Sequence, residues 1–140
     1  MKNQFLEYCS TNKFHHNDKQ IKALALIVSF YKQKNSFLKY LLKSDKKLGF
    51  YLQGDVGVGK TMLLNFFFDH LNVPKQRMHF NEFMISFHDF RHAYKLKGRN
   101  NSIEAFVKKI KEKGDLIYLD EFQVTNIVDA MILGKLFESI

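Results

Sequence analysis

Apolar residues recur at helical spacing in several stretches of this chain. Residues 18–33 place them along one stripe, and residues 83–94 repeat aromatic side chains at spacings of four, three and four. A shorter helix is predicted from Ser102 to Gly114, and a last one begins near Asn126. The pattern therefore predicts at least four amphipathic helices.

Short continuous apolar runs lie between these helices and are typical of buried strands. They occupy residues 48–52 and 116–119, and a further strand is predicted at residues 77–81. Strands that alternate with helices predict an α/β fold, with a parallel sheet flanked by helices and joined by right-handed crossovers. We expect a single, partial domain over residues 1–140, with an N-terminal helical segment at 1–47 and the core at 48–140.

A glycine-rich loop lies between the first predicted strand and the helix that follows it. It fits the pattern G-x-x-x-x-G-K-[ST] at every specified position, through Gly54, Asp55, Val56, Gly57, Val58, Gly59, Lys60 and Thr61. Glycines let backbone N–H groups approach an anion, and the positive end of the next helix adds to the attraction. We expect these eight residues and Met62 to bind ATP, with Lys60 reaching the β- and γ-phosphates and Thr61 coordinating Mg²⁺.

Two carboxylates, Asp120 and Glu121, follow the third predicted strand. Ligands of open α/β sheets sit at this carboxyl end. We expect Asp120 to hold Mg²⁺ opposite Thr61, directly or through water, and Glu121 to polarise a water for attack on the γ-phosphate. Alone, such a pair is more often a solvated strand end. The glycine-rich loop favours the catalytic interpretation, with Glu121 and Lys60 as catalytic residues.

Residues 120–131, DEFQVTNIVDAM, resemble the signature that follows the Mg²⁺ strand in the ZapE family of AAA+ ATPases. That family includes a bacterial cell-division ATPase and mitochondrial lactation-elevated ATPases. Further similarities lie at Gly49–Leu52 (GFYL), 60–62 (KTM), 77–80 (RMHF), Phe83, Met84 and His88, and fainter ones at Asp18 and Gln20. The resemblance covers residues 18–140 and implies an AAA+-type P-loop NTPase fold that hydrolyses ATP with Mg²⁺. Asn126 and the pair at 81–82 depart from the family pattern.

The resemblance also implies elements that have no counterpart in this sequence. In an AAA+ domain a sensor strand, a fifth strand, an arginine finger and a helical lid follow the Mg²⁺ strand. We therefore expect a fold truncated after that strand and its following helix, with weak turnover alone. A missing central strand leaves unpaired sheet edges. Either the two nucleotide-binding strands pair directly, or self-association or a second chain completes the domain.

Composition sets bounds on location and partners. No stretch reaches the length of apolar sequence that crosses a membrane, the start has no apolar signal core, and the single Cys9 fits a reducing compartment. We expect a cytoplasmic protein, peripheral at the inner face of the membrane if it binds there. The net charge of +8 comes from scattered lysines, which argues for a solvated surface rather than a nucleic-acid site. The resemblance implies a cell-division or membrane-associated protein partner.

Other interpretations stay open at this point. A nucleotide-binding assembly module without turnover, or a DNA-associated ATPase of the helicase-loader type, would carry the same nucleotide motifs. Phe83 and Met84 either pack in the core or grip a substrate polypeptide in the pore of an AAA+ ring. His88 and His92 have a spacing that zinc can use, but no third ligand is evident.

Overall fold

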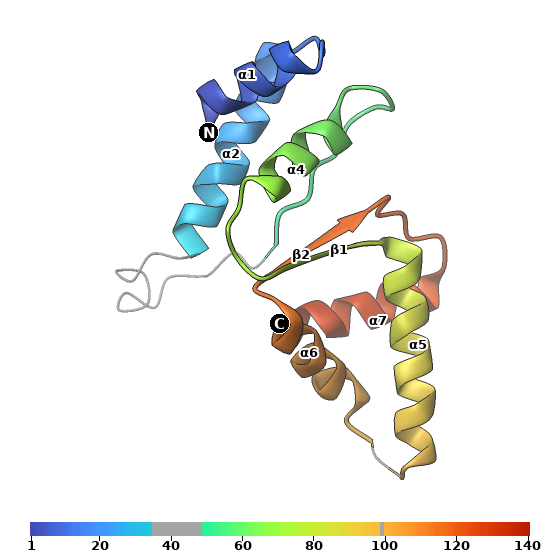
Figure 1. The fold of residues 1–140 in the computed structure, drawn as a ribbon. Helices are drawn as coiled ribbons and strands as arrows, with labels where there is room; N and C mark the ends of the chain where they lie inside the picture. The colour runs from blue at the N-terminus through green and yellow to red at the C-terminus, as the bar shows by residue number, and fades with distance from the viewer. Residues whose placement is uncertain (35–48, 99) are drawn as a thin grey trace. The chain divides into compact units, whose positions relative to one another are not determined.

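The computed structural model of the chain describes residues 1–34, 49–98 and 100–140 (Figure 1). The chain divides into two compact units, Met1–Leu71 (unit 1) and Asn72–Ile140 (unit 2). Each unit buries its own cluster of apolar side chains. The predicted mixture of helices with a parallel sheet is confirmed, and the sheet among the described residues has two strands.

Unit 1 is built from helices in the part that the structure describes. These are α1 (Lys2–Thr11), α2 (Asp18–Lys34) and α4 (Lys60–Asp69). Helix α2 confirms the helix predicted over 18–33, and α1 lies within the expected N-terminal helical segment. The core of unit 1 consists of Phe5, Cys9, Leu24, Ile27, Leu63, Phe66 and Phe67.

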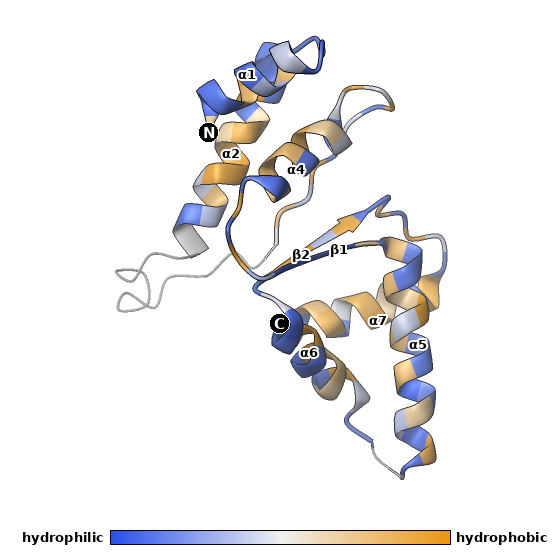
Figure 2. Cartoon of the chain, in the orientation of Figure 1, coloured by the Kyte–Doolittle hydropathy of each residue, from blue (hydrophilic) through white to orange (hydrophobic). Residues whose placement is uncertain are grey.

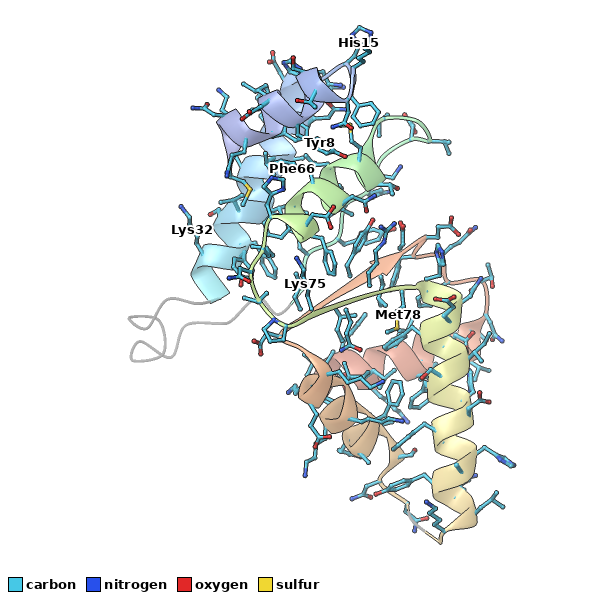
Figure 3. The ribbon with its side chains drawn as sticks, in the orientation of Figure 1. Tyr8, His15, Lys32, Phe66, Lys75 and Met78 are labelled. Atoms are coloured by element: carbon cyan, nitrogen blue, oxygen red, sulfur yellow. The ribbon has the colours of Figure 1, made fainter. Side chains whose placement is uncertain are left out.

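Helix α1 is held to α4 largely through aromatic rings. Phe5 and Cys9 share one face of α1 because they lie four residues apart, and both are fully buried. The Phe5 and Phe66 rings meet edge to face with centroids 5.1 Å apart, and Tyr8 contacts Phe66 at 5.3 Å (Figure 3). These contacts anchor the helix that follows the glycine-rich loop.

Unit 2 contains the sheet and the remaining helices. Strand β1 (Lys75–His79) pairs in parallel with β2 (Leu116–Asp120), so that His79 lies opposite Asp120. Helices α5 (Phe80–Leu96), α6 (Ser102–Lys113) and α7 (Ile127–Glu138) gather on one side of the two strands (Figure 1). This order confirms the strand predicted at 116–119 and the helices predicted around it.

The core of unit 2 is mostly aromatic. Phe83 and Phe87 of α5 contact Phe106 of α6, with ring centroids 5.7 and 5.1 Å apart. Met78 of β1 packs against the same cluster (Figure 3). Phe83 and Met84 are 5% and 4% exposed. The idea that Phe83 and Met84 grip a substrate polypeptide is therefore wrong for this structure, because both side chains are core residues.

Strand β1 ends two residues before the predicted boundary at residue 81. The backbone N–H of His79 donates to the Glu82 side chain at 3.1 Å, and α5 begins at Phe80. A carboxylate that satisfies the residue before a helix stabilises the helix start. Phe80 then turns into the core as part of the helix, where it is 3% exposed.

Helix α7 begins where the sequence predicts. The Asn126 side chain accepts a hydrogen bond from the Val128 N–H at 2.8 Å, which caps the helix. The helix is apolar around much of its surface (Figure 2). Ile132, Leu133 and Leu136 are buried, whereas Met131 remains 64% exposed. Asn126 departs from the family pattern, and its side chain caps this helix.

The strand predicted at residues 48–52 is not formed over its described part. Residues 49–55 have no regular secondary structure, Tyr51 is 66% exposed, and Leu48 lies outside the described residues. A parallel strand is stable only when neighbouring strands pair with it and helices cover it. Among the described residues the sheet consists of β1 and β2 alone, so β2 pairs only with β1.

Candidate functional site

The glycine-rich loop, residues 54–61, leads directly into α4 in unit 1. Gly57 and Gly59 have φ angles of +82° and +83°, which residues with a Cβ rarely adopt. Gly59 is the residue that precedes α4, so the loop delivers its last amides to the positive end of that helix. Consecutive amides in this conformation can surround an anion. The backbone therefore suits a phosphate group.

Lys60 is the first residue of α4 and turns back over the loop. Its Nζ donates to the carbonyl oxygens of Gly54 at 2.6 Å and Asp55 at 2.7 Å. These bonds hold the ammonium group at the loop, where an anion could replace the neutral carbonyls as a stronger, charged acceptor. The side chain thus fits the phosphate-binding role that the sequence predicts.

The neighbours of Lys60 differ in their surroundings. Thr61 is exposed in the first turn of α4, where its hydroxyl remains accessible to a cation. Val56 is fully exposed at the tip of the loop. Met62 instead packs against the core of unit 1. We infer that any contribution of Met62 to nucleotide binding comes through its backbone.

Gln20 contacts the loop, although the sequence marked it only as a faint family similarity. Its Nε2 donates to the Val58 carbonyl oxygen at 3.0 Å. The amino-acid pattern did carry one signal. Asn17 and Gln20 have the N-x-x-Q spacing of a capping box at the start of the predicted helix, and the structure forms that box.

The second group of predicted site residues lies at the end of β2 in unit 2. Asp120 accepts hydrogen bonds from Arg77 of β1 at 2.6 Å, from the Tyr118 hydroxyl at 3.1 Å and from the Glu121 N–H at 3.1 Å. Its side chain is 12% exposed. Burial alone would raise the pKa of Asp120, but these hydrogen bonds and the Arg77 charge outweigh it and lower the pKa. Asp120 is therefore a carboxylate at neutral pH, as a metal ligand must be.

Glu121 has an unusual backbone for a residue with a side chain. Its φ is +52°, in the left-handed region. The carboxylate is 80% exposed, and its Oε2 lies 4.0 Å from Nδ1 of His79. Backbone strain of this kind is common at functional sites. There it can orient a side chain in a direction that an unstrained backbone would not allow.

The predicted site residues thus form two groups. The loop residues and Lys60 come together in unit 1, and Asp120 and Glu121 in unit 2. Their joint action on one nucleotide stays a prediction. His88, considered above for zinc, has its Nε2 3.0 Å from Asp129 Oδ1. Within the described ranges, no cluster of three or more His, Cys, Asp or Glu side chains could hold a metal ion, and no helix has the length and apolarity to span a membrane.

Comparisons with known proteins identify the family of this chain. The chain matches the family described as AFG1-like ATPase over residues 3–140. Lactation elevated protein 1 homolog B of Danio rerio is 41% identical over 104 residues, which cover 66% of this chain and 20% of that protein. Cell division protein ZapE of Escherichia coli K12 is 39% identical over 93 residues, covering 66% of this chain and 24% of that protein.

A protein of Schizosaccharomyces pombe without an assigned function is 38% identical over 99 residues, or 66% of this chain and 21% of its own length. No solved structure matches the chain. The chain spans about a fifth to a quarter of the length of these curated relatives. The resemblance to the ZapE family is confirmed, and the chain belongs to the AFG1-like ATPase family.

Proposed function

We propose that this chain binds ATP with Mg²⁺ and takes part in ATP hydrolysis within an AFG1-like ATPase. The observation that carries the proposal is the conformation of residues 54–61, which place glycine amides and the Lys60 ammonium together at the start of α4. A triphosphate offers such a loop several charged oxygens. Family membership supports ATP as the nucleotide.

The acidic pair of unit 2 would supply the chemistry. Thr61 and Asp120 would hold Mg²⁺, which neutralises charge on the phosphate oxygens when bound. The lowered pKa of Asp120 keeps that ligand ionised. Glu121 would orient a water and accept its proton, and its exposed carboxylate leaves it accessible for this task.

We propose that hydrolysis by this stretch of chain alone is weak. In other NTPases an arginine that contacts the phosphates accelerates the reaction by about 10³–10⁵. Here that arginine would come from elsewhere in an assembly, through self-association or a second chain that completes the domain. The name of the Escherichia coli relative, cell division protein ZapE, supports a cell-division protein as partner. A free, buried Cys9 supports a reducing, cytoplasmic location.

A second candidate is a nucleotide-binding module without turnover. It is favoured by residues 49–55, which form no strand before the loop. The two functions differ in one measurable respect. Both predict Mg-ATP binding at the loop, but only the first predicts release of phosphate that depends on Glu121.

A thermal-unfolding titration with Mg-ATP tests the shared step. Ligand that binds only the folded chain should stabilise it by about 2.7 kcal/mol at a hundredfold excess over the dissociation constant. Lys60→Ala should remove the shift. Lys32→Ala is the matched control, because it removes the same charge from an exposed position of α2 in the same unit (Figure 3). An unchanged shift in Lys60→Ala would refute binding at this loop.

A further inference from the structure

Gln20 joins the start of α2 to the last residues of the glycine-rich loop. Its Nε2 donates to the Val58 carbonyl oxygen at 3.0 Å, across 38 positions of sequence. A Cβ atom built on Gly59 would lie 2.6 Å from the same nitrogen. The amide group of Gln20 therefore lies directly against the peptide that connects Val58 to Gly59.

The orientation of this amide is fixed by a second partner. Gln20 Oε1 accepts from the Asn17 N–H at 3.0 Å, and Asn17 Oδ1 accepts from the Gln20 N–H at 3.0 Å. A rotated amide would set its NH₂ group against the Asn17 N–H and its oxygen against the Val58 oxygen. Both contacts would be repulsive, so the donor must face the loop.

The hydrogen bond also determines where the next N–H points. In a trans peptide the carbonyl and the N–H of the following residue point in opposite directions, and the described residues contain no cis peptide bond. Because Gln20 draws the Val58 oxygen toward α2, the Gly59 N–H points away from α2. That N–H belongs to the residue preceding α4, where helices present free donors to anions.

We propose that Gln20 is a positioning residue of the nucleotide site, which aims the Gly59 N–H at a bound phosphate. This inference rests on the proposed function, because it assumes that the loop binds a triphosphate. It makes α2 a part of the site, although α2 lies far from the loop in sequence. Gln20 acts on the phosphate chain and not on the base, so its effect extends to a ligand that lacks a nucleoside.

The test compares Gln20→Met with Asn17→Ala in the 140-residue chain. Methionine keeps the length and neutrality of the side chain but removes its donor. Because Gln20→Met also removes the capping acceptor, Asn17→Ala serves as the control for a weakened cap: it leaves the Gln20 donor in place. Dissociation constants are measured calorimetrically for Mg-ATP and for Mg-tripolyphosphate, which has the phosphates alone.

We expect Gln20→Met to weaken binding of both ligands by about tenfold, in the range of one lost hydrogen bond in a polar site. Asn17→Ala should lower the melting temperature but change both dissociation constants less than twofold. Gln20→Glu keeps the acceptor for Asn17 and loses the donor, so it should weaken both ligands at least as much as Gln20→Met.

Three outcomes would overturn the role of Gln20 while leaving ATP binding intact. The first is wild-type affinity of Gln20→Met for tripolyphosphate. The second is a loss confined to Mg-ATP, which would place Gln20 at the nucleoside. The third is an equal loss in Asn17→Ala, which would make Gln20 a capping residue only. Failure of the proposed function is distinct, since the wild-type chain would then bind neither ligand, or Lys60→Ala would bind as well as wild type.

Discussion

Arg77 Nη2 lies 2.6 Å from Asp120 Oδ2 and joins the two strands of unit 2 through their side chains. Arg77 pairs with Tyr118 in the sheet register, so Asp120 is its diagonal neighbour. The Arg77 guanidinium also lies over the Tyr118 ring, 5.1 Å from its centroid. The negative charge of the carboxylate proposed to hold Mg²⁺ is thus compensated by an arginine of the neighbouring strand.

Replacing Arg77 with methionine should lower the free energy of unfolding at neutral pH by about 1 kcal/mol. The bond is charge-assisted and Asp120 is largely buried, but Arg77 is 40% exposed, so solvent weakens the pair. Urea unfolding followed by circular dichroism measures the change. Arg91→Met, at an exposed position of α5, is the control for loss of a charge. Equal stability of the two variants would contradict a stabilising pair.

The pH dependence of stability should change in the same variant. The folded pKa of Asp120 lies below its ordinary value of 3.8, so its stabilising contribution is complete above that value. It is lost as the pH falls through the lower folded pKa. Arg77→Met should reduce this loss between about pH 5 and pH 2, and Asp120→Asn should remove it. A profile identical to wild type in both variants would show that Asp120 is not the group responsible.

Glu121 should show opposite effects of substitution on stability and on turnover. Glu121→Gln is expected to abolish phosphate release and to leave Mg-ATP affinity unchanged, because the amide cannot accept the proton of water. Glu121→Gly should also abolish release, but should raise stability by about 1 kcal/mol, since glycine tolerates the φ of +52°. A phosphate-release assay and urea unfolding measure the two effects. Hydrolysis that survives Glu121→Gln would remove Glu121 from the mechanism.

Phe83 and Ile85 provide a comparison within one helix. Phe83→Ala removes a ring that is 5% exposed and should cost about 3–5 kcal/mol of unfolding free energy. Ile85→Ala, at 61% exposure, should change it by less than about 0.5 kcal/mol. Denaturant titration of both variants distinguishes a core role from a surface one. If Phe83→Ala were as stable as Ile85→Ala, the conclusion that Phe83 is a core residue would be wrong.

The sequence predicts elements well where local patterning and tertiary structure agree. Helix α2 and strand β2 lie where the apolar spacing places them, because each has a partner on its apolar side. Residues 49–52 have an equally apolar sequence but no strand to pair with in the described chain, and they form none. A strand is a property of its neighbours as much as of its own residues.

The site residues divide in the same way. The loop and the acidic pair could be found from the sequence, because their spacing along the chain is the signal itself. Gln20–Val58 and Arg77–Asp120 join residues 38 and 43 positions apart. No local pattern relates such partners, since their approach depends on how helices and strands pack. Only the structure shows that Gln20 contacts the glycine-rich loop and that Arg77 contacts Asp120.

Cys9 is the one position of this chain that a thiol-specific reagent can modify. It is the single cysteine, it is fully buried in the core of unit 1, and it shares that core with Leu63 and Phe66 of α4. Burial also raises the pKa of the Cys9 thiol, which suppresses the reactive thiolate. The rate at which a thiol reagent modifies Cys9 therefore reports how often unit 1 opens. A ligand that binds at the start of α4 and stabilises unit 1 should slow this modification.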